Sequence, residues 1–152
     1  QVHHEYLREE LPRLDFMTRK VAAVHGDHEP RLHEIRHVFE LFQSEIAVHT
    51  AEEERLVFPA IRQLESGSGN RAAGVAALRS VFAKLESEHG QAGAALEQVS
   101  ALTDRYMPPA CACNTFRAMF DTLGRLQSNM HQHVHKENNV LFPRALALGS
   151  SS

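Results

Sequence analysis

The segment Glu45-Ile46-Ala47-Val48-His49-Thr50-Ala51-Glu52-Glu53-Glu54-Arg55-Leu56-Val57-Phe58-Pro59 decides the fold. Ile46 and Leu56 continue a series of apolar residues spaced by three and four, which is the spacing of one face of an amphipathic helix. His49 and Glu53 fall on that same face, where leucine or isoleucine would be expected. The segment therefore predicts a core-facing helix that carries ionisable groups on its buried side.

Three other stretches of the chain show the same helical spacing. One runs from the start to about residue 25 and ends at Gly26 and Pro30, both of which are helix stop signals. The helix of the opening segment begins near residue 31 and ends between residues 59 and 67. The remaining two carry apolar residues over 75–99 and 116–140, with a break at 106–109 and a proline at 143. Four helices with short connections predict an all-α, antiparallel up-down four-helix bundle over residues 1–147, followed by a disordered tail at 148–152.

The bulk composition restricts the possible functions. The chain has 152 residues and a net charge of −3, so it is the size of one domain and has no basic footprint for nucleic acid. No apolar run is long enough for a membrane span. Cys111 and Cys113 are too few for a disulfide scaffold, which favours a reducing, cytoplasmic compartment. We interpret this Cys-x-Cys as two surface thiols, with a redox-active pair as the alternative.

Polar residues interrupt the apolar face of all four predicted helices. A buried imidazole or carboxylate is costly unless it is paired or bound to a metal ion. One core histidine is commonly structural, whereas six ionisable residues on four core faces indicate a metal site. The predicted ligands are His4, His49, Glu53, His89, His133 and Glu137.

Spacing within and between the helices supports this ligand set. His49 and Glu53, like His133 and Glu137, are four residues apart and therefore share a helix face. Both pairs repeat at the same interval, since 133 − 49 and 137 − 53 are each 84. Phe-Pro at 58–59 and 142–143 repeats at that interval too, and His4 precedes His89 by 85 residues. The chain therefore reads as two copies of one helical hairpin, which predicts two metal ions related by a pseudo-twofold axis.

The ligand types narrow the choice of metal. Imidazole and carboxylate without thiolate suit iron, zinc, manganese or copper, and two carboxylate-bridged ions in a bundle favour iron. Glu45 and Glu88 lie beside the ligands and are candidates for orienting a ligand or moving protons. His3 is an alternative to His4 as the first ligand.

Six histidines are left out of the site. His25 is in phase with the core face of the first helix, but it lies 21 residues after His4, or about 30 Å along a helix. His28, His33 and His37 surround the first turn and are expected to be solvated, and His131 and His135 are expected to face away from the core.

Several longer motifs resemble the hemerythrin-like domain of the RIC (repair of iron centres) family. The resemblance rests on residues 4–12, 20–26, 49–59, 86–89 and 133–145, the last of which includes Glu137-Asn138-Asn139-Val140-Leu141-Phe142-Pro143-Arg144-Ala145. It implies a non-haem di-iron protein of the bacterial cytoplasm with an oxo- and carboxylate-bridged centre, in which Glu53 and Glu137 bridge the ions. Family members often carry an additional N-terminal domain with a cysteine pair.

The function implied by the resemblance is repair or protection of iron–sulfur clusters damaged by nitrosative or oxidative stress. The expected routes are iron donation and handling of nitric oxide or dioxygen, and redox enzyme activity at the iron pair is left open. Expected partners are nitric oxide, dioxygen and damaged iron–sulfur proteins, in a monomer or a homodimer. The alternatives are a protein that binds or senses dioxygen or nitric oxide, which usually has five ligand histidines, and a purely structural metal bundle.

Overall fold

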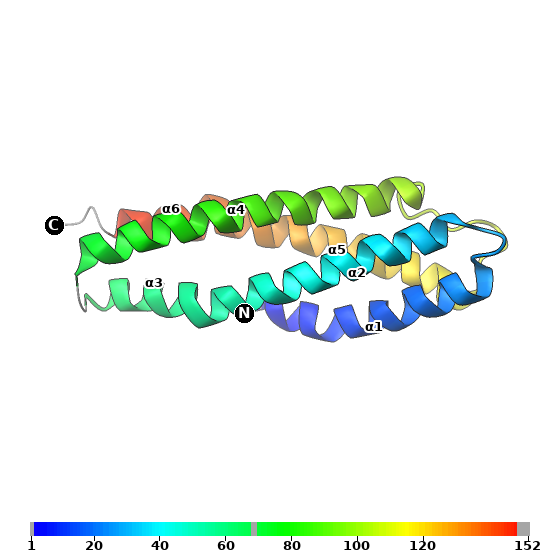
Figure 1. The fold of residues 1–152 in the computed structure, drawn as a ribbon, viewed down its shortest axis with the longest axis horizontal. Helices are drawn as coiled ribbons and strands as arrows, with labels where there is room; N and C mark the ends of the chain where they lie inside the picture. Colours follow the sequence, from blue (N-terminus) through cyan, green and yellow to red (C-terminus); the bar gives the residue numbers. More distant parts are fainter. Residues whose placement is uncertain (1, 68–69, 149–152) are drawn as a thin grey trace. The chain divides into compact units, whose positions relative to one another are not determined.

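The computed structural model describes residues 2–67 and 70–148, and helices make up nearly all of these residues (Figure 1). In chain order they are α1 (Val2–His25), α2 (Arg31–Glu52), the π-helix η1 (Glu53–Val57), α3 (Phe58–Glu65), α4 (Arg71–Leu102), α5 (Asn114–Lys136), the π-helix η2 (Glu137–Leu141) and α6 (Phe142–Ala147). Within the described ranges there is no strand. The prediction of an all-α four-helix bundle is therefore confirmed.

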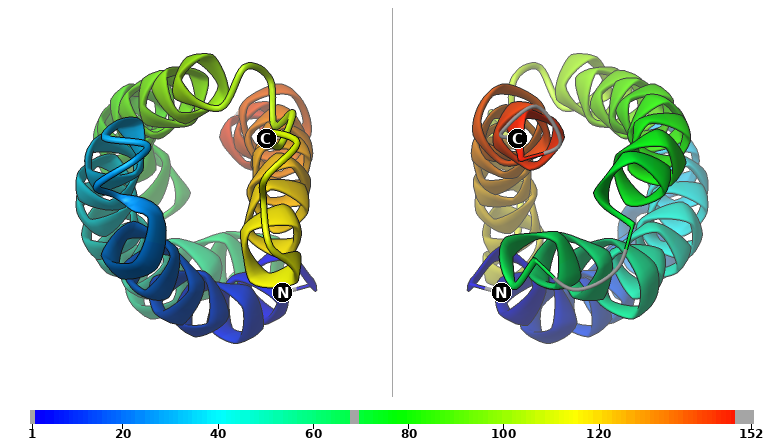
Figure 2. Two further views of the ribbon diagram at one scale, coloured as in Figure 1. Left: turned by 90° about the vertical axis from the view of Figure 1, so that its right-hand side faces the viewer. Right: turned by 90° about the vertical axis from the view of Figure 1, so that its left-hand side faces the viewer.

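The helices divide into two compact units. The first unit comprises the stretch up to Glu45 and Ala92–His131, so it holds α1, most of α2, the end of α4 and most of α5. The turn between α1 and α2 and the connection between α4 and α5 lie at the same end of this unit (Figure 2, left). Gly26 suits the first turn, because a Cβ there would lie 2.4 Å from the backbone carbonyl oxygen of Ala22.

Shortly after α4 ends at Leu102, three consecutive residues have left-handed backbone, Asp104, Arg105 and Tyr106 (φ 51°, 59° and 64°). This conformation costs non-glycine residues about 1–2 kcal/mol each. Local contacts offset the cost. The Tyr106 amide donates to the Thr103 hydroxyl (3.0 Å) and the Tyr106 hydroxyl donates to Gln127 on α5 (2.9 Å). The predicted helix break at 106–109 therefore starts a few residues earlier, at the end of α4.

The second unit comprises Ile46–Gln91 and the stretch from Gln132 onward. Helices α3 and α4 belong to this unit, and residues 68–69 of the connection between them lie outside the described ranges (Figure 2, right). Its apolar core centres on stacked rings of Phe82 and Phe142, whose centroids are 4.1 Å apart. Of the predicted tail, residues 149–152 are outside the described ranges, and Leu148 caps α6.

Two π-helical turns interrupt the helices of this unit, and they are the main departure from the predicted pattern. Each is followed by a phenylalanine and then a proline, which has no N–H to donate to the carbonyl four residues earlier. The Phe58 amide instead donates to the carbonyl of Glu53, five residues back, and Phe142 does the same to Glu137. Both turns occur at the same place in the 84-residue repeat, as the two-hairpin pattern requires.

The extra residue in each π-turn changes which side chains reach the core. Leu56 and Val140 were predicted to be buried from their α-helical phase, and this is wrong: each is 45% exposed. Val57, one residue later, is fully buried instead. The ligand residues precede or begin the π-turns, so their predicted phase is unaffected.

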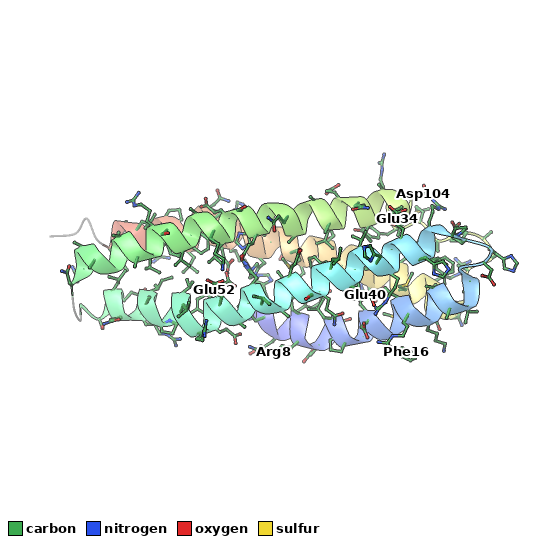
Figure 3. The ribbon with its side chains drawn as sticks, in the orientation of Figure 1. Arg8, Phe16, Glu34, Glu40, Glu52 and Asp104 are labelled. Carbon is green, nitrogen blue, oxygen red and sulfur yellow. The ribbon has the colours of Figure 1, made fainter. Side chains whose placement is uncertain are left out.

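Arg8 and Phe16 project away from α1, and Phe16 is 60% exposed with the Lys20 ammonium over its ring (Figure 3). None of the described helices is long and apolar enough to cross a bilayer.

Candidate metal centre

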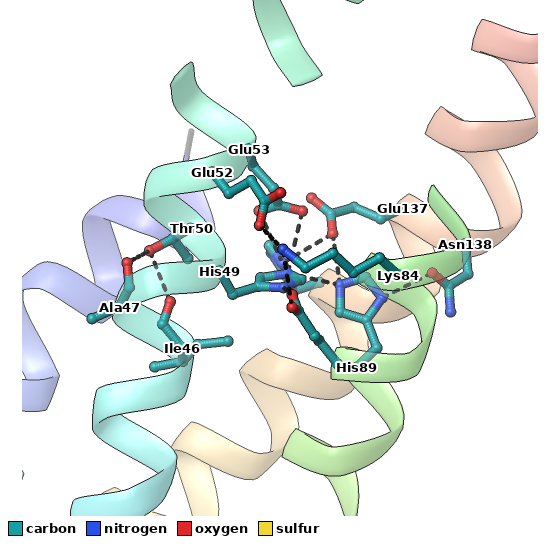
Figure 4. Close-up of polar contacts among 12 residues, drawn as sticks. Ile46, Ala47, His49, Thr50, Glu52, Glu53, Lys84, His89, Glu137 and Asn138 are labelled. Carbon is teal, nitrogen blue, oxygen red and sulfur yellow. Dashed lines mark hydrogen bonds and ion pairs between the residues drawn. The ribbon is translucent and has the colours of Figure 1, made fainter. Parts of the chain in front are cut away.

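Five of the six predicted ligands converge in the core of the second unit. His49 comes from α2, Glu53 opens η1, His89 comes from α4, His133 from α5, and Glu137 opens η2. One ligand atom from each lies within 4.8 Å of every other, and all five side chains are buried. Figure 4 shows the imidazoles of His49 and His89 and the carboxylates of Glu53 and Glu137 directed at one another.

The distances within the group are those of ligand atoms around a shared centre. The Nε2 atoms of His49 and His89 are 3.0 Å apart. Glu137 Oε2 lies 3.1 Å from Nε2 of both His89 and His133. Glu53 Oε1 is 3.3 Å from His49 Nε2, and its Oε2 is 4.0 Å from His133 Nε2. Each carboxylate therefore contacts imidazoles from two different helical segments.

Neighbouring charges and hydrogen bonds shift the pKa values of two buried side chains in this group, His49 and Glu137. Burial disfavours the charged form of His49, but hydrogen bonding and the charge of Glu53 outweigh it and raise the pKa of His49. Burial likewise acts against ionised Glu137, yet hydrogen bonds from His133 and His89 hold the pKa of that carboxyl far below its usual range. Positive charge on His49 and negative charge on the carboxylates thus stabilise one another in this buried group. A bound cation would supply positive charge in the same place.

The donor set fits first-row transition metal ions. Three imidazole nitrogens and two carboxylates, with no thiolate, suit iron, manganese or zinc. Glu53 is fully buried, and a buried carboxylate is stable only when it is paired or coordinates a cation. Within the described ranges this is the one group of three or more potential ligand side chains.

Two polar residues orient the histidine ligands from behind. Glu88 Oε2 accepts from Nδ1 of His49 at 2.8 Å, and Asn138 Oδ1 accepts from Nδ1 of His89 at 2.9 Å. A proton held on Nδ1 leaves the Nε2 lone pair directed into the centre. Lys84 lies 3.5 Å from Glu88 and also pairs with Glu52, so it anchors this edge of the site (Figure 4).

The structure places the remaining candidates as follows. Glu88 contacts the predicted ligand His49, and its role in orienting a ligand or moving protons stays a prediction. Asn138 was not singled out, because an amide following a ligand carries no distinctive signal in a sequence. His4 is buried and belongs to the first unit, where its role as the sixth ligand stays a prediction. Glu45 is exposed and also belongs to that unit. The rival His3 has its Nδ1 atom 3.1 Å from Asn129 Oδ1.

The histidines that were expected to be solvated or to face away from the core are exposed, namely His28, His33, His37, His131 and His135. His131 and His135 are exposed on either side of buried His133. His25 lies at the end of α1, where its Nε2 atom is 3.4 Å from the sulfur of Cys113.

Comparison with known proteins agrees with this geometry. Residues 1–145 match the family model described as the hemerythrin HHE cation-binding domain. The chain is 40% identical over 146 residues to the iron-sulfur cluster repair protein YtfE of Musicola paradisiaca, which covers 96% of this chain and 62% of that protein. It is 38% identical over 143 residues to the protein of that name from Pectobacterium atrosepticum (94% and 61%) and 36% identical over 145 residues to that from Escherichia coli O1:K1 (95% and 62%). The chain thus spans about three fifths of the length of these curated relatives.

Proposed function

The chain belongs to the hemerythrin HHE cation-binding domain family, and from this premise we propose that it is a di-iron protein that repairs or protects iron–sulfur clusters under nitrosative or oxidative stress. The observation that carries the proposal is the convergence of three histidines and two glutamates from separate helical segments within 4.8 Å. The names of the curated relatives support the repair role. The bacterial cytoplasm is the proposed setting, and damaged iron–sulfur proteins and nitric oxide are the proposed partners.

In this proposal His4, His49, His89 and His133 would hold the iron ions through imidazole nitrogens. Glu53 and Glu137 would hold them through their carboxylates. Their two negative charges offset part of the charge of the cations in a buried site. Bound iron would supply redox chemistry and affinity for nitric oxide and dioxygen. Each imidazole must be neutral to bind, so protons leave the site as metal enters.

We propose that Glu88 assists that proton movement. Its carboxylate contacts the buried His49 ring on one side, while its side chain is 28% exposed. Attraction to His49 and Lys84 outweighs partial burial and lowers the pKa of Glu88, so it is an anion at neutral pH. A negative acceptor at Nδ1 stabilises the proton there and frees Nε2 for the metal. Glu45 is retained as a possible proton-transfer residue on its sequence position alone.

A protein that binds or senses dioxygen is the weaker alternative. Such proteins are expected to have a fifth ligand histidine, for which His3 and His25 are the available choices. Both have other contacts in the first unit, His3 with Asn129 and His25 with Cys113. The four-histidine set therefore favours the repair proposal.

The test begins with metal analysis and an optical spectrum of protein from iron-replete cells, before and after nitric oxide. We expect about two irons per chain and a visible absorption that nitric oxide changes, both lost in His133→Ala and Glu137→Ala. His135→Ala, an exposed histidine two residues away, is the matched control and should keep the iron. Iron that survives substitution of His133 or Glu137 would contradict the proposed site.

The repair role needs its own experiment. An iron–sulfur enzyme inactivated by nitric oxide should recover activity faster with the iron-loaded protein than with Glu137→Ala. Equal recovery with both proteins would contradict a role of the metal site in repair, but it would not contradict metal binding at the site.

A further inference from the structure

The two cysteines lie in the connection that leads into α5, in the first unit. Cys111 and Cys113 are both exposed, and they flank Ala112, which is buried and whose amide donates to the carbonyl of Pro109 (2.9 Å). Ala112 is directed into the protein, and the thiols on either side of it are both exposed to solvent. The metal centre involves neither of them.

Cys113 has a histidine at its sulfur. The Nε2 atom of His25, the last residue of α1, lies 3.4 Å from the Cys113 Sγ atom. The imidazole is held by the buried ring of Phe116, with centroids 5.4 Å apart. A fixed imidazole beside an exposed thiol can take the thiol proton and pair with the thiolate that remains.

Two further features place positive charge at Cys113. It directly precedes α5, and its carbonyl accepts the Arg117 amide at 3.0 Å, so its side chain lies at the positive end of that helix. The Arg117 guanidinium donates to the carbonyls of Ala110 and Ala112, both at 3.1 Å, which holds the cation against the cysteine loop. These are the surroundings in which thiols become reactive. Cys111 has no such histidine contact among the described hydrogen bonds.

We propose that His25, Cys113 and Cys111 form a thiol–disulfide exchange site, with Cys113 as the attacking thiol and Cys111 as the resolving one. Its substrates are low-molecular-weight disulfides. A metal site is the less suitable interpretation, because among the described residues three or more potential ligand side chains converge only in the buried centre. A two-residue pair has too few ligands for a stable structural ion.

The proposed exchange proceeds in two steps. The Cys113 thiolate attacks one sulfur of the external disulfide, which forms a mixed disulfide and releases one small thiolate that takes up the proton held by His25. The Cys111 thiol, losing its proton to solvent, then attacks the Cys113 sulfur, which forms the Cys111–Cys113 disulfide and releases the second small thiol. Two protein thiols are oxidised and one external disulfide is reduced, and the reverse reaction restores the dithiol.

The test uses the full chain and oxidised glutathione, with the products followed by mass spectrometry. The wild type should form the intramolecular disulfide, and Cys111→Ser should stop at a mixed disulfide on Cys113. His25→Gln should slow the first step by about tenfold, as expected when a thiolate loses its pairing cation. His28→Gln, which changes an exposed histidine of the same turn, is the matched control and should react as the wild type does.

Equal reactivity of Cys111 and Cys113, or an unchanged rate in His25→Gln, would overturn the proposal. Alkylation rates with iodoacetamide provide a second measurement that needs no disulfide to form, and Cys113 should again react faster. Circular dichroism checks that each variant keeps its helices. Because neither readout involves iron, the result is independent of whether the metal centre functions as proposed.

Discussion

Replacing Glu88 with alanine isolates the hydrogen bond that orients His49. The acceptor at 2.8 Å keeps the proton on Nδ1, so its removal lets the ring adopt the other tautomer or rotate. Either change turns the Nε2 lone pair away from the metal part of the time. Glu88→Ala should therefore weaken metal binding without removing any ligand.

The size of the effect follows from the exposure of Glu88. Loss of a residue that supports a ligand typically costs about tenfold to a hundredfold in metal affinity. Glu88 is 28% exposed and also shares its charge with Lys84, so water can partly replace it. We therefore expect the lower end, about tenfold, which corresponds to about 1.4 kcal/mol of binding free energy.

The measurement is competition for Fe²⁺ against a calibrated chelator. Glu88→Gln keeps an acceptor oxygen and should bind more tightly than Glu88→Ala. Glu86→Ala removes an exposed acid from the same helix and serves as the control for a general change in charge. If Glu88→Ala bound iron as tightly as the wild type, the orienting role of this hydrogen bond would be refuted.

Three other changes test the rest of the structure. A metal concentration of a hundred times the dissociation constant should stabilise the fold by about 2.7 kcal/mol and so raise its melting temperature. Glu53→Gln should abolish that rise. Glu52→Gln changes the neighbouring glutamate, which pairs with Lys84, and should keep the rise. Asp15→Asn should lower the unfolding free energy by about 1 kcal/mol in urea titrations at pH 7, because the Arg36 hydrogen bond lowers the Asp15 pKa. That contribution is present above the unfolded pKa of the carboxyl and is lost as pH falls through its depressed folded value, so the two proteins should converge in acid. Phe142→Ala should cost about 3–5 kcal/mol in the same assay, and a loss below 1 kcal/mol would mean that the stack on Phe82 is not part of the core.

Much of the candidate site follows from helical periodicity alone. A helix places residues four apart on one face, so a histidine and a glutamate in phase with core leucines must be buried whatever the tertiary arrangement. The 84-residue repeat then pairs His49 and Glu53 with His133 and Glu137 without any structure. The prediction lost accuracy where the period changed, at Leu56 and Val140, because a π-turn inserts a residue that an α-helical count does not allow for.

The sequence by itself therefore determined the all-α class, the internal repeat and the buried ionisable residues, since these depend only on local period and on the cost of burying charge. Tertiary structure alone decided which groups meet across helices. Glu88 behind His49, Asn138 behind His89 and His25 at Cys113 are contacts between residues 39, 49 and 88 positions apart. Such contacts have no periodic signature, because the register between two packed helices is set by how their side chains interlock, not by the order of residues in either one.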